Sequence, residues 1–159
     1  MKLVICIDAE LGYSYHHRRL SRDKNIRLHL MKNIRERGGT LYMNAYTEKS
    51  FLKDEGVFLP KERTERMKCP AAPGTAFLEA ARRENGWAFV ENEDVTQYLP
   101  EVDEMLVYRW NRVYDADLRL PPDFAKAFTE QYTESISGSS HERVSFVRYI
   151  LTEDAEGMS

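Results

Sequence analysis

The sequence predicts a single α/β domain in which helices cover both faces of a mostly parallel sheet. Short apolar runs rich in β-formers alternate with segments of helical periodicity from residue 2 to residue 110, an order typical of parallel sheets. Two further β-rich runs, 128–136 and 144–151, follow with a short polar link between them. This second pattern predicts an antiparallel hairpin at one edge of the sheet.

The length of the chain supports one domain. Its 159 residues are enough to bury a proper core, and no linker, repeat or low-complexity segment divides them. We therefore expect one domain over residues 1–151 and a flexible tail over residues 152–159, because disorder concentrates at chain ends.

Composition and charge exclude several classes of protein. A formal net charge of −3 argues against a protein that coats DNA or anionic membranes, so a nucleic-acid site would have to be a local basic patch. No apolar run approaches the roughly 20 residues of a membrane span, and the first one meets Asp8 too early for a signal peptide. We expect a cytoplasmic protein without a membrane partner.

Cys6 and Cys69 form neither a disulfide framework nor a metal motif, so we expect no metal site.

The first half of the chain supplies the elements around the predicted site. The apolar run of residues 2–7 predicts a central strand, and residues 9–20 predict a loop. A helix follows over residues 22–37, with Ser21 as its N-cap and Gly38-Gly39 at its end. The residues expected on its apolar face are Ile26, Leu28, Leu30, Met31 and Ile34.

The rest of the chain continues the alternation. Residues 40–43 predict a second strand, residues 48–53 a short helix, and residues 54–73 an irregular segment with room for a short strand near residues 66–69. Further expected elements are a helix over 75–84, a strand over 87–90, a brief helix over 91–99, a strand over 104–110 and a turn over 114–120.

The loop after the first strand is dense in aromatic and basic residues and leads directly into the first helix. In open α/β sheets ligands bind beyond the carboxyl ends of the strands, beside helix N-termini, and this loop would lie there. Asp23, in the first turn of the helix, is the candidate catalytic residue. The candidate substrate-binding residues are His16, His17, Arg18, Arg19, Ser21, Arg22 and, from a later strand, Tyr108.

The chemistry of this loop leaves alternatives open. Arginine binds phosphate or carboxylate through two parallel hydrogen bonds, and histidine transfers protons near neutral pH. The loop is therefore suited to a nucleotide, a phosphorylated metabolite or an RNA end. The alternative is a solvated loop whose arginines pair with local acids. Asp23 has its own alternative, because an acid in a first turn also opposes the helix dipole.

In the order of its elements and in weak motifs spread over nearly its whole length, the chain resembles dihydrofolate reductase. Leu11-Gly12 stands where the family has an Ile-Gly pair, and Asp23 stands where the family has its acid. Other matching positions are Met43 to Thr47, Leu59-Pro60, Met105 to Trp110, Ala116-Asp117-Leu118 and Ser145 to Tyr149. The resemblance implies a dihydrofolate reductase-like fold, and it implies that Asp23 hydrogen-bonds and helps to protonate a pterin.

The positions that bind the nicotinamide cofactor depart from the family pattern. Glu91-Asn92 replaces a Gly-Gly pair whose backbone approaches the pyrophosphate, and acidic side chains there repel phosphate. In the second phosphate motif, Gly-Arg-x-Thr, Asn44 and Ala45 replace Gly and Arg, and Thr47 remains. Asn44 and Thr47 are thus candidates for a degraded cofactor site. We expect no cofactor, with NADPH as the alternative.

Three functional hypotheses follow, and whether the protein is an enzyme stays open. The first is a pseudoenzyme that binds a small anionic or heterocyclic ligand, such as a nucleotide, between Asp23 and the arginines at 18, 19 and 22, without normal NADPH-dependent reductase activity. The second is a divergent NADPH-dependent reductase of a pterin-like substrate. The third is an RNA- or nucleotide-processing protein of ribonuclease type that uses the basic loop.

Overall fold

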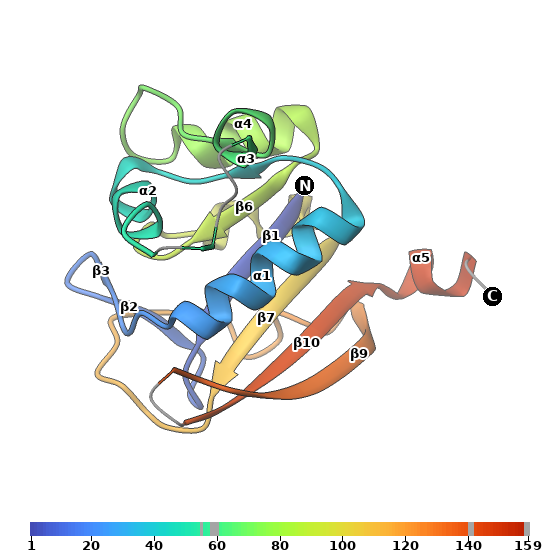
Figure 1. Ribbon diagram of the computed structural model, residues 1–159. Helices are drawn as coiled ribbons and strands as arrows, with labels where there is room; N and C mark the ends of the chain where they lie inside the picture. The colour runs from blue at the N-terminus through green and yellow to red at the C-terminus, as the bar shows by residue number, and fades with distance from the viewer. Residues whose placement is uncertain (55, 58–60, 140–141, 158–159) are drawn as a thin grey trace.

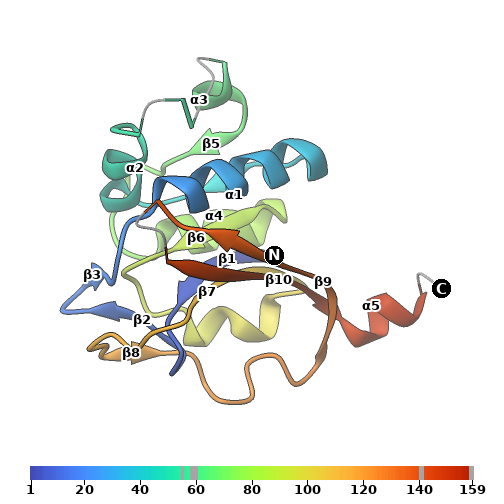
Figure 2. The ribbon, with the colours of Figure 1, turned by 60° about the horizontal axis from the view of Figure 1, so that its bottom comes forward.

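A central seven-stranded sheet organises the molecule (Figures 1 and 2). The computed structural model describes residues 1–54, 56–57, 61–139 and 142–157. The strands of the sheet are β1 (Lys2–Ile7), β4 (Leu41–Tyr42), β5 (Met67–Lys68), β6 (Trp87–Val90), β7 (Glu104–Trp110), β9 (Phe128–Ser137) and β10 (Arg143–Leu151). They are arranged in the order β5-β4-β6-β1-β7-β10-β9.

Helices pack on both faces of this sheet. The helices of the described residues are α1 (Lys24–Arg37), α2 (Ala45–Phe51), α3 (Glu62–Glu65), α4 (Ala76–Glu84), the 3₁₀ helix η1 (Thr96–Glu101) and α5 (Thr152–Gly157). Of these, α1 and α2 pack on one face of the sheet and α4 and η1 on the other. Val4 of β1 packs with the apolar face of α1, whereas Leu3 and Ile5 pack with α4, because neighbouring side chains of a strand point to opposite faces. Within the described ranges, no helix combines the length and the apolar character that a membrane crossing requires.

Strand pairing confirms the predicted fold class. β1 is parallel to both β6 and β7, β4 is parallel to β5 and β6, and β10 is antiparallel to β7 and β9. The parallel strands all end at one edge of the sheet, so the loops that follow them gather there. The candidate site lies at this edge.

The first helix differs from the prediction at its start and on its buried face. It begins at Lys24, and its N-cap is Asp23 rather than Ser21, because Asp23 is the residue whose carboxylate accepts the N–H of Ile26 (3.1 Å). The predicted apolar residue Leu28 is 37% exposed, whereas Arg27 is only 2% exposed. The buried stripe of α1 consists of Ile26, Arg27, Leu30, Met31, Asn33 and Ile34.

Other elements also depart from the prediction. The predicted loop 9–20 contains a hairpin of β2 (Gly12–Tyr15) and β3 (Arg18–Arg19), to which β8 (Leu118–Arg119) adds a third strand. α2 begins at Ala45 because Asn44 caps it, and α5 occupies the segment expected to be a flexible tail. The Leu59-Pro60 pair of the family resemblance lies outside the described residues.

We predict that Asp23→Ala lowers the free energy of unfolding by about 1–2 kcal/mol, the usual cost of losing an N-cap side chain. Urea denaturation monitored by circular dichroism measures this change. Lys24→Ala, at the exposed first position of the same helix, is the matched control and should stay within about 0.5 kcal/mol of the parent. Equal effects of the two substitutions would contradict a capping role.

Candidate functional site

Asp8, directly after β1, fixes the two walls of the site. It is fully buried; its Oδ1 accepts the N–H groups of Glu10 (2.9 Å) and Gly12 (2.8 Å), and its Oδ2 accepts the N–H of Tyr114 (2.9 Å). Gly12 permits this packing because a Cβ there would lie 2.5 Å from that of Ala116. One carboxylate therefore joins the start of the β2–β3 hairpin to the loop that follows β7.

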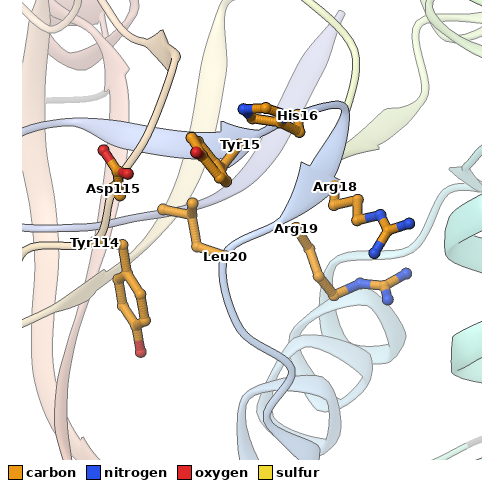
Figure 3. Close-up of a pocket in the computed structure, with 7 residues that line it drawn as sticks. All are labelled: Tyr15, His16, Arg18, Arg19, Leu20, Tyr114 and Asp115. Carbon is orange, nitrogen blue, oxygen red and sulfur yellow. The ribbon is translucent and has the colours of Figure 1, made fainter.

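A cleft of about 680 Å³ opens between that hairpin and that loop (Figure 3). We call it the hairpin cleft. In Figure 3, Tyr15 and Leu20 lie between the two arginines of β3 on one side and Tyr114 with Asp115 on the other. The lining residues are Tyr15, His16, Arg18, Arg19, Leu20, Tyr114 and Asp115.

The two predicted histidines form the turn of the hairpin. His16 (φ 49°) and His17 (φ 62°) both adopt the left-handed conformation that a two-residue type I′ turn requires and that Asn or Gly usually supplies. His16 lies beside Tyr15, with ring centroids 4.0 Å apart, in the hairpin cleft. His17 instead places Nε2 3.3 Å from Oε1 of Glu93. The two imidazoles therefore have different surroundings, and His17 does not line the hairpin cleft.

The three predicted arginines differ in whether their charge is compensated. Arg19 pairs through Nε with Oε2 of Glu91 (3.0 Å), and Arg22 pairs through Nη2 with Oδ1 of Asp54 (2.8 Å). Arg18 is exposed, and its side chain has no ion pair or hydrogen bond among the residues that the structure describes. Arg18 therefore carries an uncompensated guanidinium, and it lines the hairpin cleft at the edge where its side chain points away from Tyr114 and Asp115 (Figure 3).

Beneath the arginines lies a buried ion cluster, which we define as Arg27, Asp54 and Glu91. Arg27 Nη1 lies 3.0 Å from Asp54 Oδ2, and Nη2 lies 3.4 Å from Glu91 Oε2 and donates to Ser50 Oγ at 2.9 Å. Its guanidinium also stacks over Phe51, 4.3 Å from the ring centroid. The Arg27 side chain therefore links α1 to α2 and to the end of β6.

A small cavity of about 10 Å³ lies next to this cluster, between Cys6, Ser21 and Glu91. It matches the volume of a single water molecule and is too small for an organic ligand. Burial, together with the nearby Glu91 carboxylate, raises the pKa of the Cys6 thiol, so the thiol stays protonated at neutral pH. Burial likewise raises the pKa of the neighbouring Tyr13 to about 12. Neither group is therefore poised as a nucleophile.

Comparison with known proteins gives a match to solved structures only. No protein-family model and no curated protein sequence matches the chain. A structure of dihydrofolate reductase from Enterococcus faecalis, complexed with NADP(H) and RAB-propyl, matches over 95% of each chain with a TM-score of 0.58 and 10% identity. The fold is dihydrofolate reductase-like. At this identity the likeness extends to the fold alone.

Asp23, the candidate catalytic acid of this dihydrofolate reductase-like fold, is held by backbone groups. Its Oδ1 caps α1, and its Oδ2 accepts the N–H of Ser139 at 2.9 Å. Gly138 packs so closely that a Cβ there would lie 2.5 Å from Oδ2. Asp23 is buried and does not line the hairpin cleft, and Ser21 lines only the small cavity.

The two candidate cofactor residues lie at the N-terminus of α2, beside a second cleft of about 500 Å³ that Arg18, His16 and His17 also line. Asn44 Oδ1 accepts the N–H of Thr47 (3.0 Å), and Asn44 Nδ2 donates to Asn92 Oδ1 (2.8 Å). Asn92 in turn donates to the carbonyl of His17 (3.2 Å). Thr47 is fully buried, and its Oγ1 has no hydrogen-bond partner among the described residues.

The acidic turn after β6 differs in detail from the sequence-based expectation. The carboxylates at 91 and 93 do not form an open negative patch, because Glu91 is buried against Arg19 and Arg27 and Glu93 faces His17. Side chains fill this turn. Two arginines compensate the charge of Glu91, whereas Asp94 is exposed and has no ion pair among the described residues.

Tyr108 lies away from the hairpin cleft. It is fully buried under α1, with Oη 2.7 Å from Nδ1 of His29, and burial raises its pKa well above the ordinary value. Asn33 Nδ2 donates to the His29 carbonyl at 3.0 Å and lies 3.3 Å from the same Nδ1. The other imidazole nitrogen faces Glu134 at 3.1 Å. Tyr108 therefore serves the packing of α1 on the sheet.

Several residues of the site were missed from the sequence. Tyr15 and Leu20 lay within the loop already singled out, but Tyr114 and Asp115 come from a distant turn that no local pattern connects to it. Arg27 had a detectable signal, because it begins an i, i+3, i+4, i+7 stripe with the buried residues 30, 31 and 34. Among the described residues, no three His, Cys, Asp or Glu side chains are arranged to hold a metal ion.

We predict that Arg27→Met lowers the free energy of unfolding by about 3–5 kcal/mol, because it leaves two buried carboxylates without their shared partner. Arg22→Met is the matched control; Arg22 also contacts Asp54, but its side chain is 43% exposed, and its loss should cost about 1 kcal/mol or less. Urea denaturation of both variants measures the difference. Equal losses would contradict the importance of the buried ion cluster.

We also predict that His29→Ala lowers the free energy of unfolding by about 1–3 kcal/mol, because the buried Tyr108 hydroxyl loses its hydrogen-bond partner. The measurement is a double-mutant cycle with Tyr108→Phe, which removes the hydroxyl. His29→Ala should cost less in the Tyr108→Phe background than in the parent. The same cost in both backgrounds would show that the hydrogen bond contributes nothing.

Proposed function

We propose that this chain is a small-ligand-binding protein with a dihydrofolate reductase-like fold and without normal NADPH-dependent reductase activity. Its ligand combines an anionic group with a flat heterocyclic ring, as a nucleotide does, and binds in the hairpin cleft. The observation that carries the proposal is the uncompensated guanidinium of Arg18 in a cleft lined by two tyrosines.

The size and chemistry of the hairpin cleft support this ligand class. Its volume of about 680 Å³ falls in the range typical of small-molecule sites. Tyr15 and Tyr114 offer aromatic surface for a ring, and Arg18 offers a planar fork of donors that suits phosphate or carboxylate. Arg19 is engaged with Glu91, which leaves Arg18 as the anion contact.

Two features support the loss of ordinary reductase activity. Asp23 is buried, and both of its carboxylate oxygens already accept backbone N–H groups, so a pterin contact of the kind implied by the family resemblance would have to share those oxygens. At the position of the cofactor phosphates, Asn44 and Asn92 bond to each other. Cofactor phosphate would have to compete with that side-chain pair.

We predict that Arg18→Ala weakens binding of AMP about tenfold or more, because a hydrogen bond to a charged group contributes about 1.5–3 kcal/mol. Isothermal titration calorimetry measures the dissociation constant. Arg83→Ala is the matched control, since Arg83 is an exposed arginine of α4 whose nearest acid, Glu84, is 3.9 Å away, and it should leave the constant unchanged. Parent-like AMP binding by Arg18→Ala, or no AMP binding by the parent, would contradict the proposal.

Two further measurements address the other functional hypotheses. NADPH binding in the micromolar range, with NADPH oxidation in the presence of dihydrofolate, would favour the divergent reductase. Salt-dependent retention of labelled RNA that is lost when Arg18 and Arg19 are both replaced by Ala would favour an RNA-processing protein. His16 lies beside Tyr15 and His17 faces Glu93, and both histidines line the second cleft together with Arg18, which is where RNA binding would be looked for.

A further inference from the structure

We infer that the ligand of the hairpin cleft is zwitterionic, with a cationic group at the end opposite its anionic group. This inference rests on the proposed function and narrows its ligand class. It comes from Asp115, a second uncompensated charge that lines the same cleft as Arg18.

Asp115 is exposed, and its carboxylate has no hydrogen bond or ion pair among the described residues. The charged residues closest to it in the chain do have partners. Arg112 pairs with Glu142 and stacks on Tyr114, with 4.9 Å between its guanidinium carbon and the ring centroid. Asp117 accepts the N–H of His16 through Oδ2 at 2.9 Å. Asp115 is thus the acid of this loop whose charge remains available to a ligand.

The two uncompensated charges lie on opposite walls of the cleft. Figure 3 shows Asp115 on the side of Tyr114 and Arg18 on the side of β3, with Tyr15 and Leu20 between them. Each wall favours a group of opposite charge, and the surface between them is aromatic and apolar. An amine at one end, a carboxylate or phosphate at the other and a flat ring between them match this arrangement.

The fold holds the two walls at a fixed separation. Asp8 anchors the Tyr114 backbone, and the N–H of Asp117 donates to the carbonyl of Ser14 in β2 at 2.9 Å. The N–H of His16 also donates to Asp117 Oδ2. Residues on both sides of Asp115 are therefore hydrogen-bonded, Tyr114 to Asp8 at the end of β1 and Asp117 to the hairpin. Opposite charges on two walls held in this way select ligands by the distance between the ligand's own charges.

The test compares three probes of matched shape by isothermal titration calorimetry: 4-(aminomethyl)benzoate, 4-methylbenzoate and 4-methylbenzylamine. We expect the zwitterion to bind at least about tenfold more tightly than either singly charged probe. Asp115→Asn should abolish this advantage over 4-methylbenzoate without weakening 4-methylbenzoate itself. Asp154→Asn, at an exposed acid of α5, is the control and should change nothing.

Exchanging the charges of Arg18 and Asp115 provides a second, independent test. The double variant Arg18→Asp with Asp115→Arg should restore tight binding of the zwitterion in the reversed orientation, whereas Arg18→Asp alone should lose it. Equal affinities for 4-(aminomethyl)benzoate and 4-methylbenzoate, unaffected by Asp115→Asn, would overturn the inference and leave the anion site at Arg18 intact. Failure of all three probes to bind would also overturn it, and AMP binding would then decide the proposed function separately.

Discussion

The guanidinium of Arg27 is the constraint on which the rest of this site depends. Removing a charge from water is costly unless partners compensate it, and here Asp54 and Glu91 approach it from different segments of the chain. Because Glu91 is fixed in this way, it also holds Arg19, and Arg19 holds β3 against the end of the sheet. The buried ion cluster thus determines the position of β3, which forms one wall of the hairpin cleft.

This arrangement divides the charges at the sheet edge into two groups. The arginines nearest the core pair with buried or half-buried acids and serve the assembly of the fold, as Arg27 and Arg19 do. Arg18 and Asp115 lie farther out, on opposite sides of a cleft, and have no ion pair among the described residues. The fold is dihydrofolate reductase-like, and Asp23, the acid that the sequence resemblance singled out, caps a helix and bonds to the turn between β9 and β10.

Asp23 illustrates how far local sequence can be interpreted. Its place before an apolar stripe is typical of a helix N-terminus, and its role in opposing the helix dipole was one of the two alternatives drawn from the sequence. The choice between capping and catalysis depends on Oδ2, whose partner Ser139 is 116 positions away along the chain. The N-cap was in turn misplaced at Ser21, because Ser and Asp are both good caps and a single residue separates them.

The sequence by itself determined the alternation of helices with the strands of the main sheet, the C-terminal end of α1, the bounds of β7 and the mostly parallel sheet, because apolar periodicity and helix-ending glycines act over a few residues. Only the tertiary structure decided which basic side chains remain uncompensated. The hairpin within residues 9–20 forms because Gly12 and Ser14 pair with Arg119 and Leu118, and Arg27 is buried because Glu91 meets it. Such contacts join residues far apart in the chain, so a local pattern can indicate that Arg27 is buried but not which residues it meets.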